Sequence, residues 1–402
     1  MKISRFLILK AFMLSSCALL AIGRIYDERL ELGVVNIASL VSIVYFSSLF
    51  FMLLKIKKTS FTKSKTLFYF FFFFIIVMNP ILWLYFDVTE YGFSKAINFC
   101  LIVIPISLII VELYRYKDVL NTLYVLLGVV FFLAFIALVG LSITERTDGR
   151  MATLGGGPIV FGRWMGFGII SLIFLPLKIR SIYKHFLIVI LFVLALSSGS
   201  RGPVFALFLT GLIYFLFNFK KSLFKIFATT SILFLVLFFS GLNKKISEIG
   251  NAERVFMNVS SKGISKQSTN TRKNLAYGSL ILIKNYPFGV GSGNWQVLTN
   301  SLRPNHLMPL EYPHNIFLEI ACEYGIHTLV IFLAMLFYAV NLSYKKMLFF
   351  KNNNSSLYPL FFYLLVFFFL NSQISGMLND SRILFFIISC IIINKPLVSL
   401  NE

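Results

Sequence analysis

Apolar runs dominate the chain, and polar residues return mainly at the breaks between them. A transmembrane helix needs about 20 apolar residues, and about twelve segments satisfy that requirement. Their starts lie near Phe6, Val34, Leu67, Ala96, Val119, Pro158, His185, Gly202, Leu223, Asn315, Leu357 and Ile383. Irregular backbone cannot face lipid, so each segment is expected to be helical. The pattern predicts an all-α fold, a polytopic transmembrane helical bundle of about 12 spans.

Composition supports a membrane protein. The 402 residues are 58% hydrophobic and only 13% charged, whereas about a quarter of the residues of a soluble domain are charged. The net charge of +21 does not indicate nucleic acid, because Lys and Arg gather in short clusters between apolar runs. That placement follows the positive-inside rule. The expected partner of the surface is therefore the lipid bilayer, with no nucleic acid.

The positive clusters also predict the orientation. If the spans alternate, one side carries Lys2, Arg5, Lys55, Lys57, Lys58, Lys63, Lys65, Arg115, Lys117, Lys178, Arg180, Lys184, Lys220, Lys221, Lys345, Lys346, Lys351 and Lys395. The opposite short loops carry far fewer. Both termini are therefore expected on the cytoplasmic side of a bacterial inner membrane. The first span is expected to be retained rather than cleaved as a signal peptide.

One polar connection is much longer than the others. Residues 243–313 are rich in Gly, Asn, Ser and Tyr, and alternation of the spans places them outside. Within them, residues 270–284 are expected to form a partly amphipathic helix of a small domain on the membrane surface. The predicted domains are an N-terminal transmembrane bundle of about nine helices (1–242), an extracytoplasmic loop domain (243–313) and C-terminal transmembrane helices (314–402).

The four cysteines do not form a recognisable site. Cys17, Cys100, Cys322 and Cys390 lie within or beside apolar segments and lack the spacing of metal ligands. Neither a disulfide framework nor a metal site is expected.

Two polar motifs on the outer side combine arginine with small residues. Ser-Gly-Ser-Arg-Gly-Pro occupies 198–203, and Arg150 precedes a Gly-Gly-Gly-Pro segment at 155–158. Arginine forms paired hydrogen bonds to phosphate oxygens and small residues allow close approach, so the combination around Arg201 suits a diphosphate. Arg201 as an interfacial anchor is an equally weighted alternative, and Arg150 and Arg272 fit solvated loop charges better. The glycines at 289–293 follow no predicted strand and indicate a structural turn.

A second group of polar residues follows the long connection. His314 and Asn315 stand where it enters an apolar helix, a suitable place for a general base. Glu319 and Glu323 are four residues apart and share a helix face. Carboxylates at membrane depth usually pair, and arginines of the neighbouring segments are the expected partners, in a structural more than a catalytic ion pair.

Taken in order, these segments resemble the O-antigen ligase and polymerase family of membrane glycosyltransferases. The resemblance spans roughly 150–325 and rests on 198–203, Arg272, the Asn-Tyr-Pro-Phe-Gly-Val-Gly-Ser-Gly-Asn segment at 285–294, His314-Asn315 and Glu323-Tyr324-Gly325. It implies a GT-C-like helical fold and an undecaprenyl-diphosphate-linked glycan as donor, without a metal or other cofactor.

The resemblance also implies roles for individual residues. Arg201 and Arg272 would hold the diphosphate, and His314 would align or deprotonate the acceptor hydroxyl. The residues expected to complete substrate binding are Arg150, Ser200, Gly202, Asn315 and Glu323. Other expected partners are the acceptor, a chain-length regulator and a flippase.

The acceptor stays open between two alternatives. The Gly-Gly-Gly-Pro segment is more similar to polymerases of O-antigen, capsule or exopolysaccharide repeat units, whereas a ligase would transfer the glycan to lipid A–core. A membrane transporter is the alternative from another class. It is less favoured, because the sequence has neither paired halves nor paired helix breaks.

Overall fold

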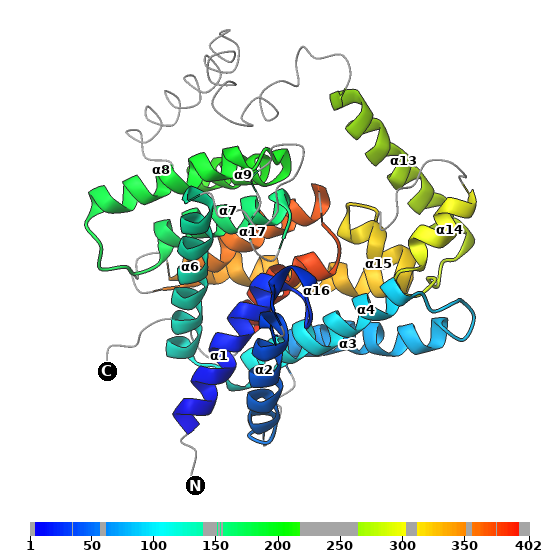
Figure 1. Cartoon of the computed structure of the whole chain (residues 1–402), viewed down its shortest axis with the longest axis horizontal. Coiled ribbons are helices and arrows are strands. Elements are labelled where there is room, and N and C mark those ends of the chain that lie inside the picture. Colours follow the sequence, from blue (N-terminus) through cyan, green and yellow to red (C-terminus); the bar gives the residue numbers. More distant parts are fainter. Residues whose placement is uncertain are drawn as a thin grey trace. The chain divides into compact units, whose positions relative to one another are not determined.

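The computed structural model describes residues 5–33, 35–56, 62–139, 151, 153, 156–217, 264–302, 312–350, 356–374 and 376–393. Nearly all of these residues are helical (Figure 1). The α-helices are α1 (Arg5–Ile22), α2 (Ile37–Leu53), α3 (Lys63–Leu82), α4 (Glu90–Asn98), α5 (Ile104–Leu113), α6 (Tyr116–Leu138), α7 (Pro158–Phe174), α8 (Ser181–Ser197), α9 (Arg201–Phe217), α13 (Ile264–Asn285), α14 (Asn294–Leu302), α15 (Ile316–Tyr324), α16 (Ile326–Phe349), α17 (Tyr358–Ile374) and α18 (Arg382–Ile392). The predicted span near Leu223 and the candidate Arg150 lie outside the described residues.

The other predicted spans coincide with helices. Four stretches are long and apolar enough to cross a membrane: Lys63–Leu82, Glu90–Leu113, Tyr116–Leu138 and Ile326–Phe349. Six described helices are apolar but shorter, between 10 and 17 residues. The chain is therefore a helical membrane protein, and the number of spans stays a prediction.

The all-α prediction has one small exception. Strands β1 (Glu31–Leu32) and β2 (Val35–Asn36) pair antiparallel between α1 and α2, with Leu32 opposite Val35. A 3₁₀ turn, η1 (Glu28–Leu30), precedes them. This hairpin closes a polar connection too short for another helix, and Asn36 ends it by capping α2 through a hydrogen bond from the Ser39 N–H.

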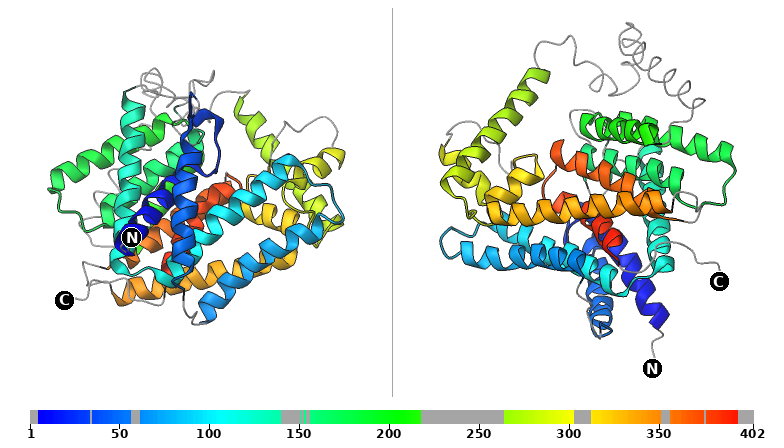
Figure 2. Two further views of the ribbon diagram at one scale, coloured as in Figure 1. Left: turned by 60° about the horizontal axis from the view of Figure 1, so that its bottom comes forward. Right: turned by 180° about the vertical axis from the view of Figure 1, so that it is seen from behind.

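The chain divides into two compact units. The first consists of Met1–Leu126, Thr269–Leu365 and Ser372–Glu402, and the second of Leu127–Ser268 and Val366–Asn371. In the first unit α1 packs on α2, α5 packs on α18, and α3 runs beside α16 (Figure 2). The division into 1–242, 243–313 and 314–402 stays a prediction.

Stacked phenylalanines form the core of the first unit. Phe71 of α3 lies 5.6 Å from Phe385 of α18 and 5.2 Å from Phe332 of α16, measured between ring centroids. Phe99 meets Phe385 edge to face at 5.4 Å. All four rings are buried, although others such as Phe337 are largely exposed. Aromatic pairs of this kind add stabilisation beyond the area that they bury, so phenylalanine serves the core as well as the lipid-facing surface.

Two of the predicted spans are interrupted. A π-helical segment, η2 (Phe99–Val103), separates α4 from α5, and such segments commonly bend a helix. Gly325, with φ of 88°, separates α15 from α16, where the sequence predicted one continuous span. Its ψ of 163° places it in the extended positive-φ region that is essentially restricted to glycine, and this conformation ends the helix. Both breaks lie next to polar side chains described below.

The second unit is centred on α7. Its glycines allow close packing, because a Cβ on Gly168 would come within 2.6 Å of Val130 and 2.8 Å of Leu191. Small residues at helix contacts are the usual means of close approach between membrane helices. The same helix carries a buried arginine, Arg163.

Candidate functional site

His314 stands directly before α15 with its backbone in an unusual conformation. Its φ is 57°, in the left-handed region that residues other than glycine rarely adopt. Its half-buried ring lies 4.2 Å from the ring of Tyr312, between centroids. Backbone strain of this kind persists only where the surroundings hold it, and it concentrates at functional sites.

Asn315 holds the start of α15. Its Oδ1 accepts hydrogen bonds from the backbone N–H groups of Phe317 (2.9 Å) and Leu318 (3.1 Å), as an N-cap does. Its Nδ2 donates to the Oε1 of Gln373 at 2.9 Å and to the carbonyl oxygen of the same residue at 3.3 Å. These bonds use both the Oδ1 and the Nδ2 of Asn315. The role of Asn315 in substrate binding stays a prediction.

The two glutamates of α15 share one lysine. Lys95 Nζ lies 2.5 Å from Glu319 Oε1 and 2.7 Å from Glu323 Oε2, and all three side chains are buried. The sequence predicted arginines of the neighbouring segments as partners, and the structure corrects this to a lysine of α4.

Lys95, Glu319 and Glu323, together called the buried triad, connect four segments. Glu319 Oε2 accepts the N–H of Leu378 at 2.9 Å, in the connection after α17. Glu323 Oε1 accepts the N–H of Gly293 at 3.1 Å. Asn379 donates to the Lys95 carbonyl at 2.9 Å. The triad therefore fixes α15 against α4, against the 286–294 loop and against the connection before α18.

The 286–294 loop is a structural turn, as the sequence indicated. Its successive N–H groups donate within the protein: Val290 to Cys322 O (2.9 Å), Gly291 to Glu323 O (2.8 Å), Ser292 to Asn79 Oδ1 (3.0 Å) and Gly293 to Glu323 Oε1 (3.1 Å). An anion-binding turn needs such groups to point at the ligand. Here those N–H groups already donate to protein oxygens. The loop, which lies between α13 and α14, is therefore hydrogen-bonded to α15 and is no phosphate cradle.

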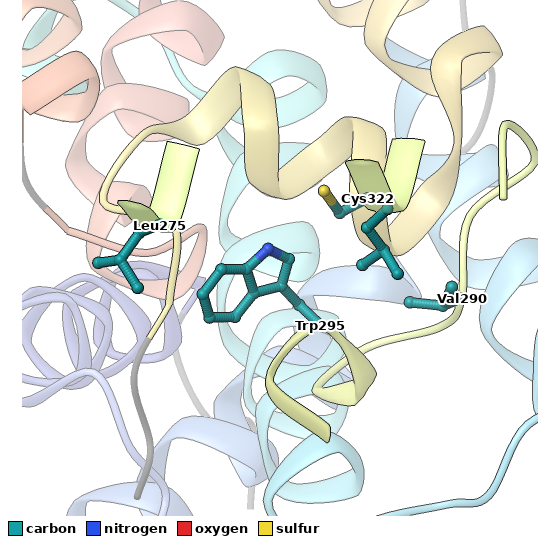
Figure 3. Packing of buried hydrophobic residues seen from close by; sticks show 5 residues of the cluster. Leu275, Val290, Trp295 and Cys322 are labelled. Carbon is teal, nitrogen blue, oxygen red and sulfur yellow. The ribbon is translucent and has the colours of Figure 1, made fainter. Parts of the chain in front are cut away.

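Arg272 lies on the exposed side of α13, and the opposite side of the helix is packed. Leu275 and Leu282 of α13 gather with Val290, Trp295 and Cys322 around the indole ring (Figure 3). Trp295 Nε1 donates to Ser279 Oγ at 2.9 Å. The sequence predicted this helix at 270–284, and the structure extends it to Ile264–Asn285. This packing holds the helix that carries Arg272.

The 198–203 motif forms a tight turn in the second unit. Gly199 has φ of 61°, Ser200 N–H donates to Ser198 Oγ at 3.2 Å, and α9 begins at Arg201. Ser200 and Gly202 are buried and Arg201 is half-buried. Gly162 of α7 lies against this turn, where a Cβ would come within 3.1 Å of Ser198 Oγ.

The predicted site residues thus fall into two groups. His314, Asn315 and Glu323 lie at the two ends of α15 in the first unit, which also holds Arg272. Ser200, Arg201 and Gly202 form one turn of the second unit. Over the described ranges, no three His, Cys, Asp or Glu side chains gather as metal ligands.

Sequence reasoning missed Lys95 and Gln373. Lys95 had a detectable signal, since it stands at the outer end of a predicted span, on the side where the short loops carry few cations. A cation there needs a partner. Gln373 had none beyond its polarity near the end of an apolar run.

Comparison with known proteins finds one family match. Residues 186–333 match the family described as O-antigen ligase. No curated protein matches the chain. The matched range includes the 198–203 turn, Arg272, the buried glutamates and His314. The match covers well under half of the chain, so it shows that this part of the chain is similar to the O-antigen ligase family.

Proposed function

We propose that this protein is a membrane glycosyltransferase that polymerises undecaprenyl-diphosphate-linked repeat units on the outer face of the bacterial inner membrane. One observation carries the proposal: a single family match, 186–333, contains Arg201, Arg272 and His314 together. The preference for a polymerase rests on the Gly-Gly-Gly-Pro segment at 155–158. The family description itself favours the second candidate, a ligase that transfers the glycan to lipid A–core.

The proposed reaction is a displacement at the anomeric carbon of the donor. The acceptor oxygen forms a bond to this carbon, and the bond to the diphosphate oxygen breaks with its electron pair leaving on the diphosphate. The hydroxyl proton passes to His314, because an imidazole can accept a proton near neutral pH. Positive charge at the leaving group stabilises the transition state, and removing one such group typically costs about 2.7–4 kcal/mol.

Arg201 and Arg272 supply that charge in this proposal, so the reaction is metal-independent. Arg201 begins α9 beside the buried Ser200 and Gly202, where small residues allow a diphosphate to approach. Arg272 is exposed on α13. Arg150 remains a third candidate cation, and the undecaprenyl chain would lie among the membrane helices.

The proposal is tested by deleting the gene in its host and examining surface glycan on a gel. Single repeat units on their usual anchor identify a polymerase. Long chains that stay on undecaprenyl diphosphate identify a ligase. Unchanged surface glycan contradicts both and favours the transporter.

Complementation then tests the residues. Arg201→Ala, Arg272→Ala and His314→Ala are expected to fail to restore the glycan although each protein reaches the membrane. Matched controls are the exposed residues Arg180, Lys273 and His185, whose alanine variants are expected to restore it. Full restoration by all three site variants would contradict the assigned roles.

A further inference from the structure

The end of α17 contacts the start of α15. Gln373, one residue before the end of α17, receives the Asn315 Nδ2 hydrogen on its Oε1 (2.9 Å) and on its carbonyl oxygen (3.3 Å). Its own Nε2 donates to Ser372 Oγ at 3.3 Å. The Gln373 amide is therefore oriented at both ends, and its oxygen points at Asn315.

His314 precedes this contact by one residue. Its φ of 57° is disfavoured for a residue with a Cβ, so the surrounding structure must hold the conformation, and its neighbours in the chain are part of those surroundings. On the C-terminal side that neighbour is Asn315, whose Oδ1 caps α15 and whose Nδ2 reaches Gln373. A change at Gln373 therefore reaches the histidine backbone through one residue.

A separate contact holds the rest of α15. Glu319 binds Lys95 and the N–H of Leu378 one turn further along the helix. This contact does not involve Gln373. Loss of the Gln373–Asn315 bond is therefore expected to loosen the start of α15 without releasing the helix.

We propose that Gln373 is a positioning residue for His314, acting through Asn315; the inference rests on the proposed function. Arg201 and Arg272 bind the donor diphosphate in that function, whereas His314 takes part only in proton transfer. A misplaced His314 therefore lowers the rate of transfer and leaves donor binding intact. Misplacement of a reacting group by about 1 Å can cost up to about a hundredfold in rate.

The test uses four single variants and one double variant of the full chain in nanodiscs. The donor is the lipid-linked oligosaccharide extracted from the deletion strain. Gln373→Leu removes the side-chain acceptor, whereas Gln373→Glu keeps an oxygen there. Asn315→Ser keeps a capping oxygen and removes the Nδ2 donor. The matched control is Asn36→Ser, because Asn36 also caps a helix and donates its Nδ2 to a distant carbonyl, that of Asp27, at 2.7 Å.

The proposal predicts about a tenfold fall in kcat for Gln373→Leu and at least as large a fall for Asn315→Ser, with donor KM within about twofold. Gln373→Glu and the control Asn36→Ser are expected to keep kcat near the wild-type value. The double variant Gln373→Leu/Asn315→Ser should be no slower than Asn315→Ser alone, because Gln373 acts only through Asn315.

Three results overturn the inference: wild-type kcat for Gln373→Leu, a rise in KM in place of the fall in kcat, or additive effects in the double variant. Additive effects would instead mean that Asn315 contacts substrate directly. A wild-type protein that transfers no glycan from the extracted donor would refute the proposed function itself, and the inference with it. If the inference alone fails, the wild-type protein still transfers glycan, and only the variants depart from the expected values.

Discussion

Replacing Lys95 by Met tests the energetic role of the buried triad. Met has a stem of similar length without the charge, so the substitution leaves Glu319 and Glu323 buried without a cation. Removing one partner of a buried ion pair typically costs about 3–5 kcal/mol, because the remaining charge is uncompensated. At about 2 °C per kcal/mol for a unit of this size, the thermal midpoint should fall by about 6–10 °C.

The measurement is thermal unfolding of the purified protein in nanodiscs, followed by intrinsic fluorescence. The triple variant K95M/E319Q/E323Q should recover most of the loss, because the Gln side chains are neutral and still offer oxygens to the N–H groups of Leu378 and Gly293. The control K63M makes the same change at an exposed lysine of α3 and should shift the midpoint by about 1 °C or less.

Two results would refute this reasoning. An unchanged midpoint in K95M would mean that the triad contributes nothing to stability. A triple variant no more stable than K95M would mean that lost packing, and not uncompensated charge, accounts for the fall.

Three further predictions concern the loop, the helix that carries Arg272, and the orientation. Gly293→Ala should destabilise the protein more than Gly33→Ala does. Both glycines have a positive φ, which destabilises an alanine there by about 1–2 kcal/mol. Only at Gly293 would the new Cβ also collide with the Gly92 backbone. Equal falls in thermal midpoint would contradict the close packing of this loop. Trp295→Ala should lower the free energy of unfolding by about 3–5 kcal/mol and speed tryptic cleavage at Lys273, because the indole packs against α13. The control Trp83→Phe, at a half-buried position outside that cluster, should not change the cleavage rate. Unaltered cleavage in Trp295→Ala would contradict the packing described. In intact cells, a membrane-impermeant maleimide should label Lys273→Cys but not Lys63→Cys, and both positions are exposed. Background labelling is limited to the half-buried Cys100, because Cys17, Cys322 and Cys390 are buried. The reverse pattern would invert the proposed topology.

Local features of the fold were predictable from the sequence. Runs of apolar residues located the helices, because a span must satisfy its own backbone hydrogen bonds. The amphipathic pattern found α13, although the helix begins at Ile264 rather than near residue 270. The break at Gly325 was not anticipated, because glycine is common within membrane helices and its positive φ depends on contacts with the 286–294 loop.

Pairing between distant segments was not predictable in the same way. The sequence indicated that Glu319 and Glu323 share a helix face and need a cation. It could not identify Lys95, which precedes Glu323 by 228 residues, because helix periodicity carries no information on which helices pack together. Asn315 shows the same limit. Its cap on α15, through Phe317 and Leu318, is local to the sequence, but its bond to Gln373 depends on the end of α17.

The sequence separation within the buried triad has a consequence for biogenesis. Lys95 is synthesised 228 residues before Glu323. At about 5–20 residues per second, the chain therefore spends roughly 10–45 s with this lysine in or near the membrane before its carboxylate partners exist. A chain truncated before α15 retains the uncompensated cation permanently. Such a fragment is expected to be recognised as unassembled and degraded, so that synthesis through α15 becomes the condition for survival of the N-terminal helices.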